Sequence, residues 1–558
     1  MEQLEDAART KKIAYFSMEI GLEQNIPNYS GGLGILAGDT LRSCADLNLP
    51  VVGVSLLSRK GHFRQELSGD GWQIEHPEVW DPSEYMTKLP FVVEVRIENR
   101  DVKVGAWLYT IHSITGGEIN VILLDTDREG NSSEDRKITS YLYGGDERYR
   151  LKQEMVLGIG GVKFLDEIDL RIRRYHMNEG HSAFLTLELL KKFDMNPDRV
   201  RELCVFTTHT PVAAGHDQFS YDLVKEFMGD YLPIETLKDL CGEESLNMTR
   251  LALNLSKYVN GVAKSHKESS RDMFPGYEIH SITNGVHSFT WTCESFRTLF
   301  DKYIPGWANE PWLFARAGII PNDDIWHAHK YAKKELIDYI NETTNAGMDV
   351  DTLTIGFARR ATGYKRNALI FSDLERLKKI NREEGLQLVF GGKAHPKDDE
   401  GKKMIQEIVG YSHDLKDELK IVYLENYEMG LAKKMVSGVD VWLNTPMPPY
   451  EASGSSGMKA AHNGVLNFSV IDGWWVEGMI EGVTGWSIGR APNGDFSEEE
   501  LRIKELEDLY SKLEYIIAPT YYNKKDAWIT MMKNAIGKTA NYFNSHRMML
   551  RYVTEAYF

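Results

Sequence analysis

The segment EASGSSGMK, residues 451 to 459, combines a carboxylate, three hydroxyls, two glycines and a lysine within nine positions. Glycine and serine leave backbone N–H groups able to face an anion, and a helix that begins near Ser455 would add the positive end of its dipole. Lys459 would then lie one turn inside that helix, about 6 Å along its axis. This spacing suits a ligand that carries both a phosphate and an aldehyde, such as pyridoxal phosphate. An ordinary Gly/Ser loop before a helix is the alternative for this segment by itself.

A second chemical segment, FARRATGYKR at residues 357 to 366, follows a predicted strand. Four cations fall within its last eight residues, where the composition of the chain predicts about one. Arginine offers a bidentate fork to phosphate oxygens, and lysine offers a compact point charge. In a chain this acidic, the cluster predicts an anion site at the end of a strand. A solvated charge run on a helix face is the alternative.

The segment GGLG, residues 31 to 34, is a third candidate, because three glycines would let the backbone approach a phosphate or a sugar. Its order differs from the dinucleotide fingerprint G-x-G-x-x-G, so no nicotinamide site is predicted. Asn178, His209 and Asn284 each follow a short apolar run and could hydrogen-bond sugar hydroxyls.

Two histidine pairs could suggest a metal, His176 with His181 and His209 with His216. Neither pair has the spacing of an H-E-x-x-H helix, and no cysteine lies beside them. The sequence therefore predicts no metal site, and these histidines are expected to be hydrogen-bonded turn residues. It also lacks the G-x-S-x-G elbow of serine hydrolases.

The composition narrows the classes of protein. A chain of 558 residues exceeds one hydrophobic core, so two or more domains are expected, and 42% hydrophobic and 26% charged residues are typical of a soluble globular protein. The net charge of −17 argues against a nucleic-acid partner, because a phosphate backbone needs a basic face. No apolar run predicts a membrane span, and the charged N-terminus has no signal core. Four scattered cysteines favour a reduced cytoplasmic location.

Short apolar runs alternate with helix-length segments, which predicts an α/β fold built on parallel sheets. In the first half we expect a helix at 35–47, antiparallel strands within 91–114, and single strands at 13–18, 51–57, 120–124, 173–177, 204–208 and 278–282. In the second half we expect a helix at 323–341, strands at 352–358, 386–390, 420–423, 439–444 and 465–470, and a helical tail from residue 498.

These patterns predict an N-terminal domain over residues 1–320 with inserted hairpins and a C-terminal domain over residues 321–520. A helical tail over residues 521–558 is expected to pack back on the first domain. The unusual residues fall at turns after strands, where open α/β sheets bind ligands.

Together the motifs resemble the α-glucan phosphorylases that act on glycogen, starch and maltodextrin. The family's pyridoxal-phosphate motif, E-A-S-G-T-G-N-M-K, is similar to residues 451 to 459, and its extension N-G-A-L…D-G is similar to Asn463 to Leu466 with Asp472 and Gly473. Further matches follow in the family's order: SMEIG (17–21), GGLG (31–34), THT (208–210), ITNGV (282–286), RRATGYKR (359–366) and GGKA (391–394).

The resemblance implies two Rossmann-like domains that face a central cleft, the GT-B type of glycosyltransferase fold. It also implies reversible phosphorolysis, in which orthophosphate shortens an α-1,4-glucan and releases α-D-glucose 1-phosphate. Pyridoxal 5'-phosphate is the cofactor that it implies, with Lys459 as the anchor and the cofactor's phosphate acting in proton transfer. Glucan and orthophosphate are the implied partners, and the family is often a homodimer.

The resemblance also assigns roles to single residues. Arg359 and Lys365 match residues that hold the cofactor phosphate, and Arg360 matches the clamp on substrate phosphate. The remaining matches are Ser455 and Ser456 as hydrogen-bonding groups at the helix start, His209, Asn284, Glu451 and Gly454 around the glucosyl hydroxyls, Gly32 and Leu33 on the phosphate side, and Tyr364 and Glu19 near the active centre. Arg360, Lys365, His209 and Glu451 are the expected catalytic group.

Several features depart from the family pattern. The family's Thr-Gly-Asn is Ser455-Ser456-Gly457 here, a common histidine is Thr362, and an arginine is Glu428, which puts a phosphate role for that position in doubt. The chain is also shorter than the animal and plant forms and resembles the compact prokaryotic type. Nucleotide or phosphorylation control of their kind is therefore not expected.

Two other functions stay open. A nucleotide-sugar-dependent glucan synthase shares the two-domain fold and a GGLG loop, and could use Arg360 and Lys365 on a diphosphate, but gives no reason for Lys459. An inactive glucan-binding scaffold is opposed by the presence of all three residues.

Overall fold

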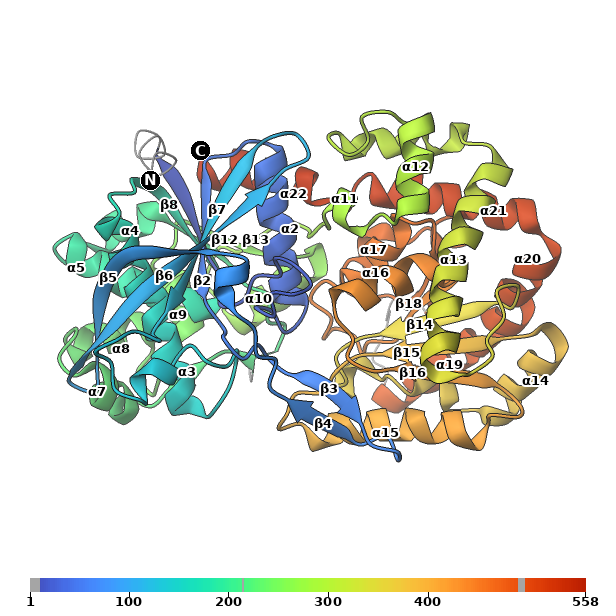
Figure 1. The fold of residues 1–558 in the computed structure, drawn as a ribbon, viewed down its shortest axis with the longest axis horizontal. Helices are drawn as coiled ribbons and strands as arrows, with labels where there is room; N and C mark the ends of the chain where they lie inside the picture. Colours follow the sequence, from blue (N-terminus) through green and yellow to red (C-terminus); the bar gives the residue numbers. More distant parts are fainter. Residues whose placement is uncertain (1–10, 213–214, 490–496) are drawn as a thin grey trace. The chain divides into compact units, whose positions relative to one another are not determined.

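A computed structural model describes residues 11–212, 215–489 and 497–558, and the chain divides into two compact units (Figure 1). Unit 1 comprises the residues up to Phe63, Pro77–Thr283 and Met548–Phe558, whereas unit 2 comprises Arg64–His76 and Asn284–Arg547. The chain thus passes from unit 1 into unit 2 twice, first for Arg64–His76 and then for Asn284–Arg547. It returns to unit 1 each time and ends there. Residues 1–10 of the predicted first domain and 490–496 of the predicted second domain lie outside the described residues.

Unit 1 is built on a nine-stranded sheet in the order β13-β12-β9-β8-β1-β2-β7-β6-β5. The strands from β13 to β7 run parallel, and β6 and β5 add an antiparallel edge. Its central strands are almost wholly buried, as is usual where a parallel sheet is covered on both faces. The strands are β1 (Lys12–Phe16), β2 (Val51–Leu56), β5 (Thr87–Ile97), β6 (Arg100–His112), β7 (Glu118–Asp125), β8 (Ile172–Asn178), β9 (Cys204–Thr207), β12 (Tyr258–Gly261) and β13 (His280–Ser281).

The helices of unit 1 connect these strands. They are α2 (Gly32–Asp46), α3 (Glu147–Met155), α4 (Gly161–Glu167), α5 (Leu185–Lys192), α6 (Pro197–Leu203), α7 (Tyr221–Met228), α8 (Ile234–Cys241), α9 (Met248–Asn254) and α10 (Lys264–Met273). The short strands β10 (Gln218–Phe219) and β11 (Leu246–Asn247) form a separate pair. Two sequence predictions need correction. The GGLG segment forms the first turn of α2, because Ile35 N already donates to Gly31 O, and the strand expected at 278–282 shrinks to two residues.

Unit 2 is built on six parallel strands in the order β16-β15-β14-β17-β18-β19. They are β14 (Thr354–Ala358), β15 (Gln387–Gly391), β16 (Lys420–Leu424), β17 (Val441–Asn444), β18 (Leu466–Val470) and β19 (Gly485–Ile488). The sequence predicted strands that overlap β14, β15, β16, β17 and β18, and it missed β19. The α/β class of the prediction is confirmed.

The helices of unit 2 include one long helix and many short ones. They are α11 (Ser288–Trp291), α12 (Glu294–Tyr303), α13 (Asn322–Thr344), α14 (Leu374–Glu384), α15 (Asp399–Asp414), α16 (Met429–Gly438), α17 (Ser456–Ala461), α18 (Trp475–Gly478), α19 (Glu498–Lys512), α20 (Ala518–Asn523) and α21 (Lys525–Asn534). Helix α22 (Ser545–Tyr552) spans the boundary between the units. A hairpin of β3 (Arg64–Leu67) and β4 (Gln73–His76) belongs to unit 2, although the chain on both sides of it belongs to unit 1. Among the described residues no helix is long and apolar enough to cross a membrane.

A buried ion pair fixes α13 against the sheet of unit 2. The Lys333 ammonium and the Asp440 carboxylate are both fully buried and paired, and His329 Nε2 lies 2.7 Å from the other Asp440 oxygen. Asp440 also accepts a hydrogen bond from Thr354 N at 2.8 Å, at the start of β14. One carboxylate therefore holds the helix and two strand starts in register.

We expect Lys333→Met to destabilise unit 2 by about 3 kcal/mol or more, because it leaves the Asp440 charge buried without its cation. Urea unfolding followed by tryptophan fluorescence measures this change. Lys334→Met is the matched control, since that lysine pairs with Asp338 at the surface and should change stability by about 0.5 kcal/mol or less. Equal effects of the two substitutions would contradict the argument.

Candidate functional site

The basic segment and the EASG segment meet in unit 2 around one carboxylate. Arg359 follows β14 directly, and its guanidinium lies 2.7 Å from Glu451 Oε2. The Lys365 ammonium pairs with the same oxygen. All three side chains are about nine-tenths buried. Residues 92 positions apart in the sequence thus form one charged cluster, because β14 and β17 are neighbours in a parallel sheet and end at the same edge.

The cluster carries more positive than negative charge. Burial and the nearby Arg359 cation lower the pKa of Lys365 to about 7, although Glu451 opposes the shift. Burial would raise the pKa of Glu451, but Arg359 and Lys365 outweigh it and hold that pKa below its usual value. Arg360, whose side chain is exposed, is the next residue along the chain. Two buried cations share one carboxylate, and Arg360 adds a third positive charge close to Lys365, so a bound anion would complete the charge balance.

Asp472 sets the position of the Glu451 backbone. It follows β18, and its carboxylate accepts hydrogen bonds from Glu451 N at 2.9 Å and from Gly473 N at 2.8 Å. Burial raises the pKa of Asp472 to about 7. Gly454 has a φ of +83°, which favours glycine and lets the loop turn back towards Glu451. The role of Asp472 was not predicted, although its motif was noted in the sequence.

Lys459 lies in α17, one turn after Ser455, as the sequence predicted. Its side chain is 8% exposed, and its ammonium lies 3.8 Å from the centre of the Trp291 ring. Trp291 had no role in the sequence analysis, because nothing in a lone tryptophan marks it as the neighbour of a distant lysine.

The hydroxyl groups of the EASG segment and of the basic segment differ in their hydrogen bonding. Ser455 is the N-cap of α17 but makes no side-chain capping bond, and Ser456 Oγ accepts a hydrogen bond from Trp442 Nε1 at 3.1 Å. Ser453 Oγ is buried and has no hydrogen-bond partner among the described residues. Thr362 Oγ1, which belongs to the basic segment, is also buried and has no hydrogen-bond partner among the described residues. These two hydroxyls are able to bond to a ligand.

Other predicted residues of unit 2 take distinct positions. The Tyr364 ring lies 4.5 Å from the Lys365 ammonium, and burial raises the pKa of Tyr364 to about 12. Asn284 is 4% exposed, and its Oδ1 has no partner among the described residues. Glu428, where the family pattern has an arginine, caps α16 by accepting from Gly430 N at 2.8 Å and Leu431 N at 3.0 Å. That carboxylate therefore has a structural role.

The predicted sugar contacts of unit 1 gather at the carboxyl ends of β8 and β9. His209 Nε2 lies 2.6 Å from Asn178 Oδ1, and His209 N donates to Glu179 Oε2 at 2.8 Å. Burial lowers the pKa of His209 to about 4, so the ring is neutral at neutral pH. Glu179 has φ +75° and ψ 164°, a conformation that is normally reserved for glycine. Its carboxylate also accepts from Thr210 Oγ1 at 2.9 Å and from Gly180 N at 2.9 Å, which explains why the strained backbone persists. Glu179 was not predicted as a site residue.

The GGLG segment is held by Glu19. Glu19 Oε2 accepts hydrogen bonds from Ser30 N at 2.5 Å and Gly31 N at 3.2 Å, and its other oxygen accepts from Tyr143 at 3.0 Å. Gly32 is exposed, and beyond its chain neighbours and the backbone of its own helix no atom lies within 4 Å of the place where a Cβ would be; Leu33 is half-buried. The start of α2 thus has open space beside it, as a ligand loop requires.

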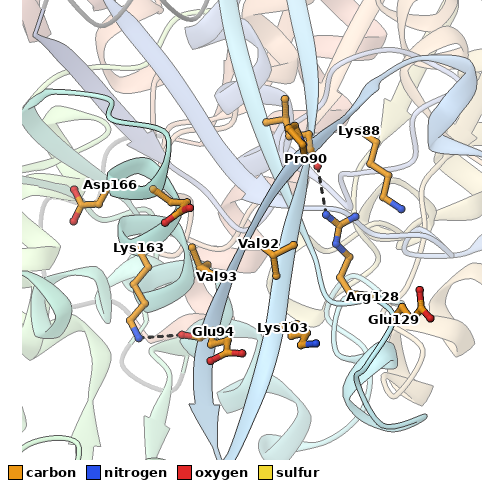
Figure 2. Close-up of a pocket in the computed structure, with 12 residues that line it drawn as sticks. Lys88, Pro90, Val92, Val93, Glu94, Lys103, Arg128, Glu129, Lys163 and Asp166 are labelled. Carbon is orange, nitrogen blue, oxygen red and sulfur yellow. Dashed lines mark hydrogen bonds between the residues drawn. The ribbon is translucent and has the colours of Figure 1, made fainter. Parts of the chain in front are cut away.

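A cavity of about 1170 Å³ lies elsewhere on unit 1, against β5, β6 and α4 (Figure 2). None of the predicted site residues lines it. Lys163 donates to Glu94 O at 3.0 Å, and Arg128 reaches back to Leu89 O at 3.4 Å. Four cations and four carboxylates line this cavity, so its charge does not favour an anion.

Comparisons with known proteins identify the family of the chain. The family model for carbohydrate phosphorylases matches residues 18–151 and 208–485. A maltodextrin phosphorylase of Thermococcus litoralis is 40% identical over 590 residues, which cover 98% of this chain and 70% of the relative. A glycogen phosphorylase of Aquifex aeolicus is 37% identical over 606 residues, with 98% and 86% covered. An uncharacterised protein of Methanocaldococcus jannaschii is 31% identical over 555 residues, with 98% and 100% covered.

The chain therefore belongs to the carbohydrate phosphorylase family. The resemblance stated from the sequence motifs is confirmed, and with it the prediction that the protein is an enzyme of the glycosyltransferase class. The roles of single residues stay predictions, which the geometry above makes specific.

We expect the anion affinity of the Arg359–Lys365 cluster to fall as the pH rises above about 7. The lowered pKa of Lys365 means that the ammonium is fully charged only below that pH, and an anion binds the charged form. Sulfate is a suitable probe, because its charge is constant over this range. Calorimetric titration of the cofactor-free protein should show at least about tenfold weaker sulfate binding at pH 8.5 than at pH 6.

Lys365→Arg is the control for this titration, because a guanidinium stays charged and should flatten the pH profile. A profile of the unaltered protein that is already flat would show that Lys365 does not titrate near pH 7.

Proposed function

We propose that this protein is an α-1,4-glucan phosphorylase, which uses orthophosphate to shorten a glucan reversibly and releases α-D-glucose 1-phosphate. The observation that carries the proposal is the buried excess of cations around Glu451, with Arg360 beside it and a buried lysine in the same segment as Glu451. Such a cluster fits two phosphate groups. A hydrolase transfers the sugar to water and binds no phosphate, so it does not require these cations. The relatives named for maltodextrin and glycogen support an α-glucan as the substrate.

The residues present fit pyridoxal 5'-phosphate as the cofactor. Lys459 offers a buried amine, the Arg359–Lys365 pair offers charge for a phosphate, and Ser453 and Thr362 offer buried hydroxyls that have no partner among the described residues. When bound, the cofactor supplies a phosphate that exchanges a proton with the substrate phosphate. Lys459 would hold the cofactor, Arg359 and Lys365 would offset its charge, and Ser455, Ser456 and Tyr364 would be further groups that bind it.

The chain's own residues bind the substrate phosphate and the sugar. Arg360 binds the substrate phosphate through a bidentate fork, and its charge stabilises the phosphate as the glycosidic bond breaks. His209, neutral at the working pH, hydrogen-bonds a glucosyl hydroxyl without adding charge. Asn284, Glu451 and Gly454 complete the sugar contacts, and the Gly32–Leu33 turn covers the phosphate side. These groups position the reactants and exclude water, so phosphate rather than water receives the glucosyl unit.

A nucleotide-sugar-dependent glucan synthase is the competing function. It would use Arg360 and Lys365 on a diphosphate, but it leaves the buried Lys459 amine without a task. The phosphorylase accounts for both features.

We also propose the fold type, the oligomeric state, the cellular location and the partners of this protein. The chain has the GT-B type of fold that its family implies, and the active protein is a homodimer in the cytoplasm. The four cysteines are all free thiols, as a reduced compartment allows. Glucan and orthophosphate are the partners.

Covalent attachment of the cofactor to Lys459 is the first expected result. Borohydride reduction of the native protein, followed by peptide mass mapping, should place a pyridoxyl group on Lys459. Lys459→Ala should lose the label and the cofactor absorbance, whereas Lys365, a second buried lysine, serves as the internal control and stays unmodified. An unmodified Lys459 in protein that still releases glucose 1-phosphate would refute the assignment.

Arg360→Ala should keep the bound cofactor but lower phosphate-dependent kcat/KM about 100-fold or more, because it removes a charge that serves the transition state. Glucose 1-phosphate release measures this loss. Arg382→Ala, which removes an exposed arginine from α14, is the control and should stay within about twofold. Turnover that survives in Arg360→Ala would exclude this residue from the mechanism.

A further inference from the structure

The β3–β4 hairpin carries two buried glutamines that face the loop after β15. Gln65 and Gln73 are each 1% exposed, although the hairpin is a two-stranded sheet that joins neither large sheet. Neither glutamine belongs to any of the motifs recognised in the sequence. Buried amides on so small an element require an explanation.

Both amides bond to backbone atoms outside the hairpin. Gln73 Nε2 donates to Ala394 O at 2.9 Å, and Gln73 Oε1 accepts from Ala394 N at 2.9 Å, so the side chain pairs with that residue as a strand would. Gln65 Nε2 donates to Gly392 O at 2.9 Å, and Gln65 Oε1 accepts from Asn426 N at 2.8 Å. The two amides also bond to each other at 2.9 Å. Every polar atom of the pair has a partner, which makes the arrangement rigid.

Further contacts hold the hairpin on α15, beside which it lies (Figure 1). Lys402 Nζ lies 2.9 Å from Glu75, and Gln406 donates to Asp70 at 2.9 Å. Gly71, at the turn, lies so close to α15 that a Cβ there would be 2.6 Å from Val409 Cβ. The hairpin is therefore a fixed support for the loop that it touches.

That loop, residues 391 to 394, lies directly against the basic segment. Arg359 N donates to Gly391 O at 3.2 Å, and Ala361 N donates to Lys393 O at 3.1 Å. Gly392 has a φ of +134°, and a Cβ there would lie 2.0 Å from Arg359 O. No side chain fits between the two backbones. The position of the loop therefore sets the position of the backbone from Arg359 to Ala361, which carries both arginines.

A charged group of the hairpin also lies close to this segment. The pKa of His395 is lowered by burial and then by Arg360, and Glu75 opposes that shift. Arg360 and the hairpin carboxylate Glu75 therefore both lie close enough to His395 to act on its charge. The hairpin, the loop and the substrate-phosphate arginine form one neighbourhood within unit 2.

We infer that Gln65 and Gln73 are positioning residues of the phosphate site, which hold the 391–394 loop so that Arg359 and Arg360 point their charges at the bound phosphates. The inference rests on the proposed function. Without the amides, the Ala394 backbone groups lose their partners and Gly392 O keeps only the hydrogen bond from Tyr423 Oη at 2.8 Å, so the loop and the arginine backbone move together. A misplacement of about 1 Å at a site costs roughly 100-fold in activity, so a smaller shift of the bidentate fork is sufficient to weaken phosphate binding about tenfold.

The test uses glutamine-to-methionine variants, because methionine keeps the length and volume and removes the hydrogen bonds. Gln73→Met is the principal variant and Gln65→Met the second. Gln387→Met is the matched control. Gln387 is equally buried at 1%, and its amide also bonds to backbone, to Asp349 O at 2.7 Å and Asp349 N at 3.1 Å. It lies at the start of β15, the end of the strand away from the 391–394 loop.

In the cofactor-loaded enzyme, Gln73→Met and Gln65→Met should raise the KM for orthophosphate about tenfold, with the KM for glucan within about twofold. In the cofactor-free protein, calorimetry with sulfate and reconstitution with pyridoxal phosphate should show weaker binding of both ligands. Gln387→Met should lower the melting temperature by a similar amount without changing any of these constants.

The inference is overturned if Gln387→Met weakens phosphate and sulfate as much as the hairpin variants do. It is also overturned if both hairpin variants lower only the melting temperature. Gln65→Met decides the matter where Gln73→Met does not fold. A wild-type protein that binds sulfate but makes no glucose 1-phosphate would refute the proposed function, and the sulfate affinities of the variants would still decide the role of the hairpin.

Discussion

The sharing of one carboxylate by two buried cations is the constraint on which the site depends. Arg359 and Lys365 both reach Glu451, and neither can leave it without exposing an uncompensated charge to a low-dielectric surrounding. Their surplus charge favours an anion, and the burial that lowers the Lys365 pKa makes that preference depend on pH. The three residues lie on segments that only the sheet order of unit 2 brings together.

The geometry of parallel sheets explains why the site residues come from such distant parts of the chain. In unit 2 the ends of β15, β14, β17 and β18 lie side by side, and they lead into the GGKA loop, the basic segment, the EASG segment and Asp472. In unit 1, β8 and β9 are neighbours in the same way and lead into Asn178, Glu179 and His209. Each unit therefore collects polar groups at one edge of its sheet. Unit 2 supplies cations, whereas unit 1 supplies groups that are neutral or hydrogen-bonded.

The departures from the family pattern have local explanations. Glu428 replaces an arginine and caps α16, so the helix start gains an acceptor where the family has a cation. Thr362 replaces a histidine and presents a buried hydroxyl beside the basic segment. The strained backbone of Glu179 also has a local explanation. Its carboxylate accepts three hydrogen bonds, which together hold a backbone conformation that would otherwise be unfavourable.

The sequence by itself determined the α/β class, most strands of both sheets, the family, and the candidate cations with Lys459. It could do so because apolar periodicity and short motifs are local properties. Only the tertiary structure decided that Glu451 neutralises Arg359 and Lys365, that Trp291 lies beside Lys459, and that Asp472 and Glu179 fix their neighbours. It also placed the β3–β4 hairpin on the GGKA loop. These contacts join segments from 21 positions apart, as for Asp472 and Glu451, to 327 positions apart, as for Gln65 and Gly392. They depend on strand order and burial, which no local pattern encodes.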